Sequence, residues 1–233
     1  MRNVLMALMV CTALSVSAAD AKPKTYLALG DSYTIGQSVD EAERYPVQLA
    51  KLLAKDGIAV ADPQIIARTG WTTDELTAGI AAATPAPKGP YDLVSLLIGV
   101  NNQFRGRSED EYKTQFEALL KQSIAFAGGD AGHVIVFSIP DWGVTPFAKR
   151  FDSAKIATEI DRFNAINKAA AEKAGAKYVD ITPVSRKAAT DATLVARDGL
   201  HPSGSMYTEW SKLALDGAKS ILSNEKQASP DKK

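Results

Sequence analysis

Short apolar runs alternate with amphipathic stretches along the chain, a pattern typical of strands alternating with helices. Five short apolar runs are predicted to be buried strands: residues 26–29, 64–67, 92–98, 133–139 and 177–181. Five longer stretches have apolar residues at helical spacing and are predicted to be helices: residues 45–55, 73–83, 109–126, 152–174 and 205–222. Apolar strands separated by helices usually form a parallel sheet covered on both faces. The pattern therefore predicts one α/β domain with a five-stranded parallel sheet.

The first residues have the layout of a secretory signal peptide. Arg2 precedes an apolar run that extends to about Val16, and small residues follow at Ala18 and Ala19. Because this run is shorter than the roughly 20 residues that a spanning helix needs, a signal is favoured over a membrane anchor. We expect a signal peptide over residues 1–19, cleaved near Ala19, and export to the periplasm or the medium without stable membrane insertion. The domain is expected over residues 24–223, with a disordered tail at 224–233.

Composition narrows the classes of function. Lys and Arg number 27, and Asp and Glu also number 27, so the zero net charge offers no footprint for a nucleic acid. The single cysteine cannot form an internal disulfide, and two histidines are too few for an imidazole-rich zinc site. We therefore expect no metal and no cofactor, and a small molecule as the partner.

Polar residues follow the predicted strands, where ligands bind in open parallel sheets. They supply a hydroxyl, a glycine turn, two carboxamides and an aspartate–histidine pair, and they are Ser32, Gly70, Asn101, Asn102, Asp198 and His201. Nucleophilic acyl transfer needs a nucleophile, a base, a carboxylate that orients the base, and donors for an oxyanion. The carboxyl edge of the predicted sheet therefore carries the groups that nucleophilic acyl transfer needs.

Only two histidines are available as the base. His133 begins a predicted strand and so belongs at the opposite edge of the sheet, which favours a structural role. His201 lies on the same loop as Asp198, three residues after it, and Pro202 disfavours helical geometry at His201. We therefore assign the role of base to His201.

Four short blocks resemble those of the SGNH hydrolases, also called GDSL-type hydrolases, in the order of that family. They are Gly-Asp-Ser-Tyr ending at Tyr33, the isolated Gly70, Gly-Val-Asn-Asn ending at Asn102, and Asp-Gly-Leu-His ending at His201. The resemblance extends across nearly the whole chain after the predicted signal. It implies a three-layer α/β/α sandwich related to flavodoxin and the hydrolysis of carboxylic esters.

The resemblance also implies roles for single residues. Ser32 would be the nucleophile, His201 the base and Asp198 the acid that orients it, acting through an acyl-enzyme. The backbone N–H groups of Ser32 and Gly70 and the side-chain amide of Asn101 would form the oxyanion hole. The third block departs from the family, because Asn102 stands where Asp is usual.

The substrate is less specified by the sequence. Trp71, Asn102, Phe104 and Trp142 follow strand ends and are candidates for substrate binding. The pattern favours small or medium acyl esters, lysophospholipids or O-acetylated glycans. A noncatalytic ligand- or glycan-binding protein on the same fold is the alternative. A phosphodiester hydrolase is disfavoured, because such enzymes normally use a metal cluster.

Overall fold

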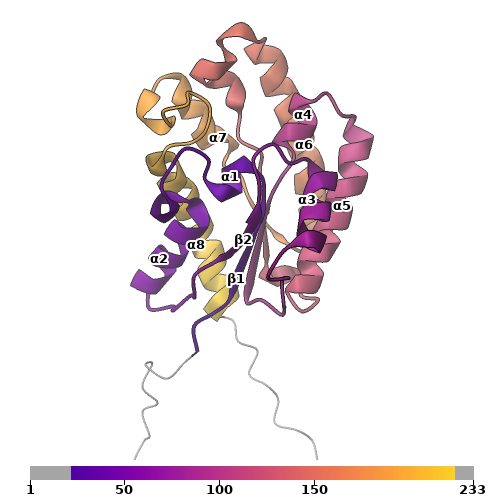
Figure 1. The fold of residues 1–233 in the computed structure, drawn as a ribbon, viewed down its shortest axis with the longest axis vertical. Helices are drawn as coiled ribbons and strands as arrows, with labels where there is room; N and C mark the ends of the chain where they lie inside the picture. The colour runs from indigo at the N-terminus through magenta and orange to yellow at the C-terminus, as the bar shows by residue number, and fades with distance from the viewer. Residues whose placement is uncertain (1–21, 224–233) are drawn as a thin grey trace, which may run out of the picture.

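A five-stranded parallel sheet lies at the centre of the fold in a computed structural model, which describes residues 22–223 (Figure 1). The strand order is β2-β1-β3-β4-β5. The strands are β1 (Tyr26–Gly30), β2 (Gln64–Ala67), β3 (Leu93–Leu97), β4 (Val134–Phe137) and β5 (Lys177–Val179). The predicted α/β fold with five parallel strands is confirmed. Because β1 lies between β2 and β3, the chain reverses its direction across the sheet there, which is the usual place for a ligand.

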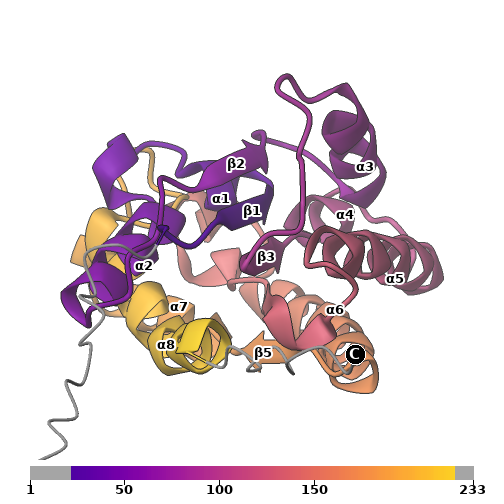
Figure 2. The ribbon, with the colours of Figure 1, turned by 90° about the horizontal axis from the view of Figure 1, so that it is seen from below.

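Five long helices cover the two faces of the sheet (Figure 2). Helices α2 (Tyr45–Lys55) and α8 (Gly204–Ser223) pack together on one face. Helices α3 (Thr73–Ala82), α5 (Glu109–Phe126) and α6 (Ser153–Ala174) cover the other. The predicted bounds of α2 and α5 agree with those observed, and the other long helices differ by one residue at one or both ends. The three layers match the expected sandwich.

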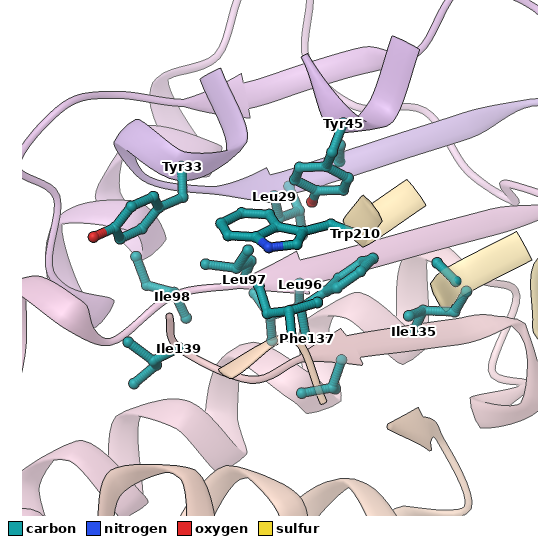
Figure 3. Packing of buried hydrophobic residues seen from close by; sticks show 14 of the residues in the cluster. Leu29, Tyr33, Tyr45, Leu96, Leu97, Ile98, Ile135, Phe137, Ile139 and Trp210 are labelled. Carbon is teal, nitrogen blue, oxygen red and sulfur yellow. The ribbon is translucent and has the colours of Figure 1, made fainter. Parts of the chain in front are cut away.

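Aromatic side chains connect the sheet to the helices on the α2 and α8 face. Trp210 of α8 is completely buried and lies between Tyr33 and Tyr45 in Figure 3. The ring centres of Tyr33 and Trp210 are 6.1 Å apart, and those of Tyr45 and Phe137 of β4 are 4.9 Å apart. Burying a large aromatic side chain contributes roughly 1.5–3 kcal/mol. This packing therefore holds the residue after Ser32 firmly against the core.

Short helices follow the strands directly and were not predicted. They are α1 (Ser32–Ile35), α4 (Val100–Phe104) and α7 (Thr182–Ser185). Six single-turn helices also occur in the connections: Glu41–Glu43, Ala131–His133, Trp142–Val144, Pro146–Arg150, Arg186–Ala189 and Ala192–Leu194. A segment of three to five residues is too short to show a period of 3.6, so the hydrophobic pattern does not reveal it.

The predicted signal peptide and C-terminal tail lie outside the described residues. Between residues 22 and 223, none of the helices is both long and apolar enough to cross a membrane.

Candidate active site

One cavity of about 180 Å³ at the carboxyl edge of the sheet contains most of the predicted site residues. Of those residues, it is lined by Ser32, Gly70, Asn101, Phe104, Trp142 and His201. Its other lining residues are Tyr33, Thr69, Val100, Phe147 and Leu200. The connections that follow all five strands supply this lining, so segments far apart in the chain meet at one place. No lysine, arginine, aspartate or glutamate is among these lining residues.

Ser32 is the first residue of α1 and is 95% buried, with an exposed fraction of 5%. The side chain of Asp31 caps this helix, since its Oδ1 accepts a hydrogen bond of 3.0 Å from the backbone N–H of Tyr33. The chain turns sharply from β1 into α1 at Gly30, where a Cβ atom would collide with Thr34 and with the carbonyl of Leu97. As the first helical residue, Ser32 has no acceptor within α1 for its own N–H, which leaves that group free to donate to a ligand.

Asp198 and His201 form a close pair on one turn. His201 Nδ1 lies 2.6 Å from Asp198 Oδ2. Asp198 Oδ1 accepts hydrogen bonds of 2.9 Å from the N–H groups of Leu200 and His201. The turn itself passes through Gly199 at a φ of +75°, and the N–H of Ala196 donates to the carbonyl of His201. The local hydrogen bonds therefore hold the carboxylate against one nitrogen of the ring.

Ser38 is a site residue that the sequence did not reveal. Its hydroxyl donates a 2.6 Å hydrogen bond to Oδ2 of Asp198, 160 residues away in the chain. Partial burial disfavours the charge of Asp198, but the hydrogen bonds from Ser38, Leu200 and His201 outweigh it and lower the pKa of this carboxyl well below its usual range. Ser38 adopts a φ of +67°, which is strained for a residue other than glycine.

Gly70 and Asn101 are held by their neighbours. Gly70 has a φ of +86°, and Arg105 donates a 2.6 Å hydrogen bond to its carbonyl. Asn101 Nδ2 donates to the carbonyl of Trp71 at 2.9 Å, which uses one of its two amide hydrogens. The second hydrogen therefore remains available on the atom that the resemblance assigns to the oxyanion hole.

Asn102 and Trp71 do not line this cavity. Asn102 is fully buried, and its amide holds the start of α3: Oδ1 accepts from the N–H of Thr73 at 3.1 Å, and Nδ2 donates to Thr73 Oγ1 at 2.7 Å. An ionised aspartate has no hydrogen with which to make the second bond, so the asparagine suits its surroundings. Trp71 packs over Gly79 of α3, where a Cβ atom would overlap its ring.

His133 lies at the opposite edge of the sheet, as its position at a strand start predicted. Its Nδ1 is 2.8 Å from the carbonyl oxygen of Asp92. It lines a larger cavity of about 730 Å³, which contains neither Ser32 nor His201. Within residues 22–223, no three histidine, cysteine, aspartate or glutamate side chains are gathered closely enough to hold a metal ion.

This arrangement of sheet, serine turn and aspartate–histidine loop agrees with the comparison to known families. Residues 28–208 match the model of the GDSL-like lipase/acylhydrolase family. The chain therefore belongs to this family, whose members hydrolyse ester bonds. No curated protein matches the chain.

Solved structures of low sequence identity share the fold. TesA has a TM-score of 0.66 at 18% identity, with 85% of this chain and 99% of that chain covered. The psychrotrophic esterase EstA from Pseudoalteromonas sp., inhibited by monoethylphosphonate, has a TM-score of 0.61 at 19% identity and coverages of 86% and 100%. A lipase/acylhydrolase from Enterococcus faecalis has a TM-score of 0.63 at 18% identity, with coverages of 84% and 96%.

Proposed function

We propose that this protein is an exported serine hydrolase that cleaves carboxylic esters through Ser32, His201 and Asp198. The observation that carries the proposal is the shared cavity of Ser32, Gly70, Asn101 and His201, with Asp198 bound to the far side of the imidazole. A serine hydroxyl needs an adjacent base to act as a nucleophile near neutral pH. His201 is the only histidine that lines this cavity.

In the proposed reaction, Ser32 Oγ attacks the ester carbonyl carbon while its proton passes to Nε2 of His201. Asp198 keeps the proton of the imidazole on Nδ1 and stabilises the imidazolium. The oxyanion accepts hydrogen bonds from the N–H groups of Ser32 and Gly70 and from the Asn101 amide, each worth about 3 kcal/mol in the transition state. His201 then returns the proton to the departing alcohol. Water releases the acyl group from Ser32 by the same steps in reverse.

The volume and the lining of the cavity favour a substrate with a small or medium uncharged acyl group. Its volume of about 180 Å³ is below the roughly 300–1,000 Å³ of sites that enclose drug-sized ligands. Aromatic and aliphatic side chains are part of its lining, with Phe104, Trp142, Phe147 and Leu200 among them. Together with the proposed export, this favours esters of small or medium apolar acyl groups over acetylated glycans, whose polar rings prefer hydrogen-bonding partners.

Labelling with a fluorophosphonate tests the proposal, because this probe reacts with activated serines. The wild-type chain should be labelled at Ser32, located by peptide mass spectrometry, and should hydrolyse p-nitrophenyl acetate. Ser32→Ala should abolish both signals, whereas Ser153→Ala, at the start of α6, should change neither. Unchanged labelling and turnover after Ser32→Ala would exclude Ser32 as the nucleophile and favour a noncatalytic binding protein.

Ser38 gives a separate prediction about the proposed acid. Ser38→Ala should lower kcat/KM for p-nitrophenyl acetate by about tenfold, because a hydrogen bond to a charged group typically contributes 1.5–3 kcal/mol. Ser38→Gly removes the same hydroxyl but suits the positive φ, so it should lose as much activity while being more stable than Ser38→Ala in urea unfolding. If only the alanine variant lost activity, backbone strain would be responsible instead of the hydrogen bond.

A further inference from the structure

A cluster of exposed phenylalanines stands beside the candidate active site. Phe104, Phe147 and Phe151 are 50%, 44% and 46% exposed. They are three of the four large hydrophobic side chains that are exposed in the described part of the chain, and the fourth is Leu213 of α8. Single exposed apolar residues are ordinary, but a contiguous group usually marks an interaction surface.

The cluster is preformed and rigid at its base. Trp142 is buried, and its ring centre lies 5.4, 6.1 and 5.2 Å from those of Phe104, Phe147 and Phe151. Phe147 and Phe151 stack on each other at 5.7 Å. The indole Nε1 of Trp142 donates to Gln103 of α4 at 2.9 Å. The rings therefore need little ordering to meet a partner.

Basic residues lie among these rings although the whole chain is neutral. Lys149 and Arg150 are exposed and stand between Phe147 and Phe151, in the segment at the top of Figure 1 that connects β4 to α6. Within residues 22–223, neither makes an ion pair. The nearest acid in sequence, Asp152, accepts a hydrogen bond from the backbone N–H of Lys155.

The loop that carries His201 adds to the same surface. The N–H of Phe147 donates to the carbonyl of Gly199 at 2.9 Å, which joins the two segments. Arg197 on that loop is exposed and also makes no ion pair with the described residues. The acid on the other side, Asp141, is buried and paired with Arg186 at 2.9 Å. Lys149, Arg150 and Arg197 therefore place three exposed cations around the phenylalanines, against two exposed carboxylates in the same segments, Asp152 and Asp198.

We propose that residues 146–151 dock this protein on an anionic lipid surface, with the cavity opening toward that surface. Exposed phenylalanines flanked by lysine and arginine suit the boundary between lipid headgroups and acyl chains. Phe104 and Phe147 belong both to the cluster and to the cavity lining, so an ester in the lipid layer has a continuous apolar path to Ser32. The proposal relies on the proposed function only for what happens to that ester.

Vesicle co-sedimentation tests the docking without any turnover. The full chain should bind vesicles of phosphatidylcholine containing about one-third phosphatidylglycerol more tightly than phosphatidylcholine alone, and less tightly in high salt. Lys149→Gln with Arg150→Gln should weaken binding to the anionic vesicles roughly 30-fold at low salt, from about fivefold per charge. Phe151→Ser should weaken it about fivefold, since part of a phenylalanine transfer free energy is lost.

Two control variants match these changes elsewhere on the molecule. Leu213→Ser removes an equally exposed apolar side chain from α8. Lys55→Gln with Lys121→Gln removes two exposed lysines, one at the end of α2 and one within α5. Both should bind anionic vesicles like the wild type. Equal binding to both kinds of vesicle, or docking variants that bind like these controls, would overturn the proposal.

Hydrolysis of p-nitrophenyl acetate, a soluble ester, separates this proposal from the function of the site. Phe151, Lys149 and Arg150 do not line the cavity, so their variants should retain wild-type turnover. A wild type that binds vesicles but hydrolyses no ester contradicts the proposed function alone. Variants that alter acyl-chain preference on soluble esters and leave vesicle binding unchanged would overturn docking and assign the segment to substrate binding.

Discussion

Replacing His201 by glutamine should lower kcat for p-nitrophenyl acetate at least about 10⁴-fold, the order of effect seen when a triad base is removed. Glutamine keeps polar atoms near Asp198 but cannot take the proton of Ser32. The measurement is steady-state kinetics at saturating ester, with the folded state checked by circular dichroism. KM should change little, because the imidazole acts mainly in the transition state.

His133→Gln is the matched control for this experiment. His133 lies at the other edge of the sheet, against the carbonyl of Asp92, and the base assignment leaves it no role. Its variant should keep the wild-type kcat, because His133 does not line the cavity of Ser32 and His201. Comparable losses from both variants would contradict the assignment of the base to His201.

Asp31→Asn should remove a strong pH dependence of stability. Burial raises the pKa of Asp31 to about 7, against 3.8 in the unfolded chain, and the hydrogen bond from Tyr33 only partly opposes this. Oδ2 is buried and has no hydrogen-bond partner in the described part of the protein. The side chains of Tyr33, Tyr45 and Tyr207 are buried too, and burial raises their pKa values, so these hydroxyls stay neutral.

The direction in which stability changes with pH follows from proton binding to Asp31 in the folded and unfolded states. Between about pH 4 and pH 7 the folded state holds the proton more tightly than the unfolded state, so the free energy of unfolding falls as pH rises. Above about pH 7 the ionised carboxylate costs about 4 kcal/mol, from a shift of 3.2 units (7 − 3.8) at 1.36 kcal/mol each. An asparagine at position 31 can still cap α1 but cannot ionise. The free energy of unfolding of the variant, relative to that of the wild type, should therefore rise by about this much from pH 4 to pH 8.

Urea unfolding at several pH values measures this difference. Asp130→Asn is the control, because Asp130 caps a similar single turn through Gly132 but is exposed. The difference in the free energy of unfolding between Asp130→Asn and the wild type should not rise in this way between pH 4 and pH 8. A stability difference for Asp31→Asn that stays flat with pH would contradict the raised pKa.

The strands and long helices were predictable because each repeats its hydrophobic pattern over enough residues. The convergence of Ser32, Gly70, Asn101 and His201 on one edge was also predictable, since parallel strands align their carboxyl ends. The contact of Ser38 with Asp198 was not, because a hydrogen bond between residues 160 positions apart leaves no local pattern. The exposure of Phe147 was likewise invisible, since a phenylalanine in a connection is as easily buried.

Side-chain hydrogen bonds join the connection after β2 to the connection after β3, and this has a consequence for engineering. Asn101 holds the carbonyl of Trp71, Asn102 holds Thr73, and Arg105 joins the carbonyl of Gly70 to Glu75. These two connections therefore form one unit, and Gln103 also accepts a hydrogen bond from Trp142 in the segment after β4. A chimera that takes either connection alone from a relative would break the bonds, so new specificity is better grafted as the pair.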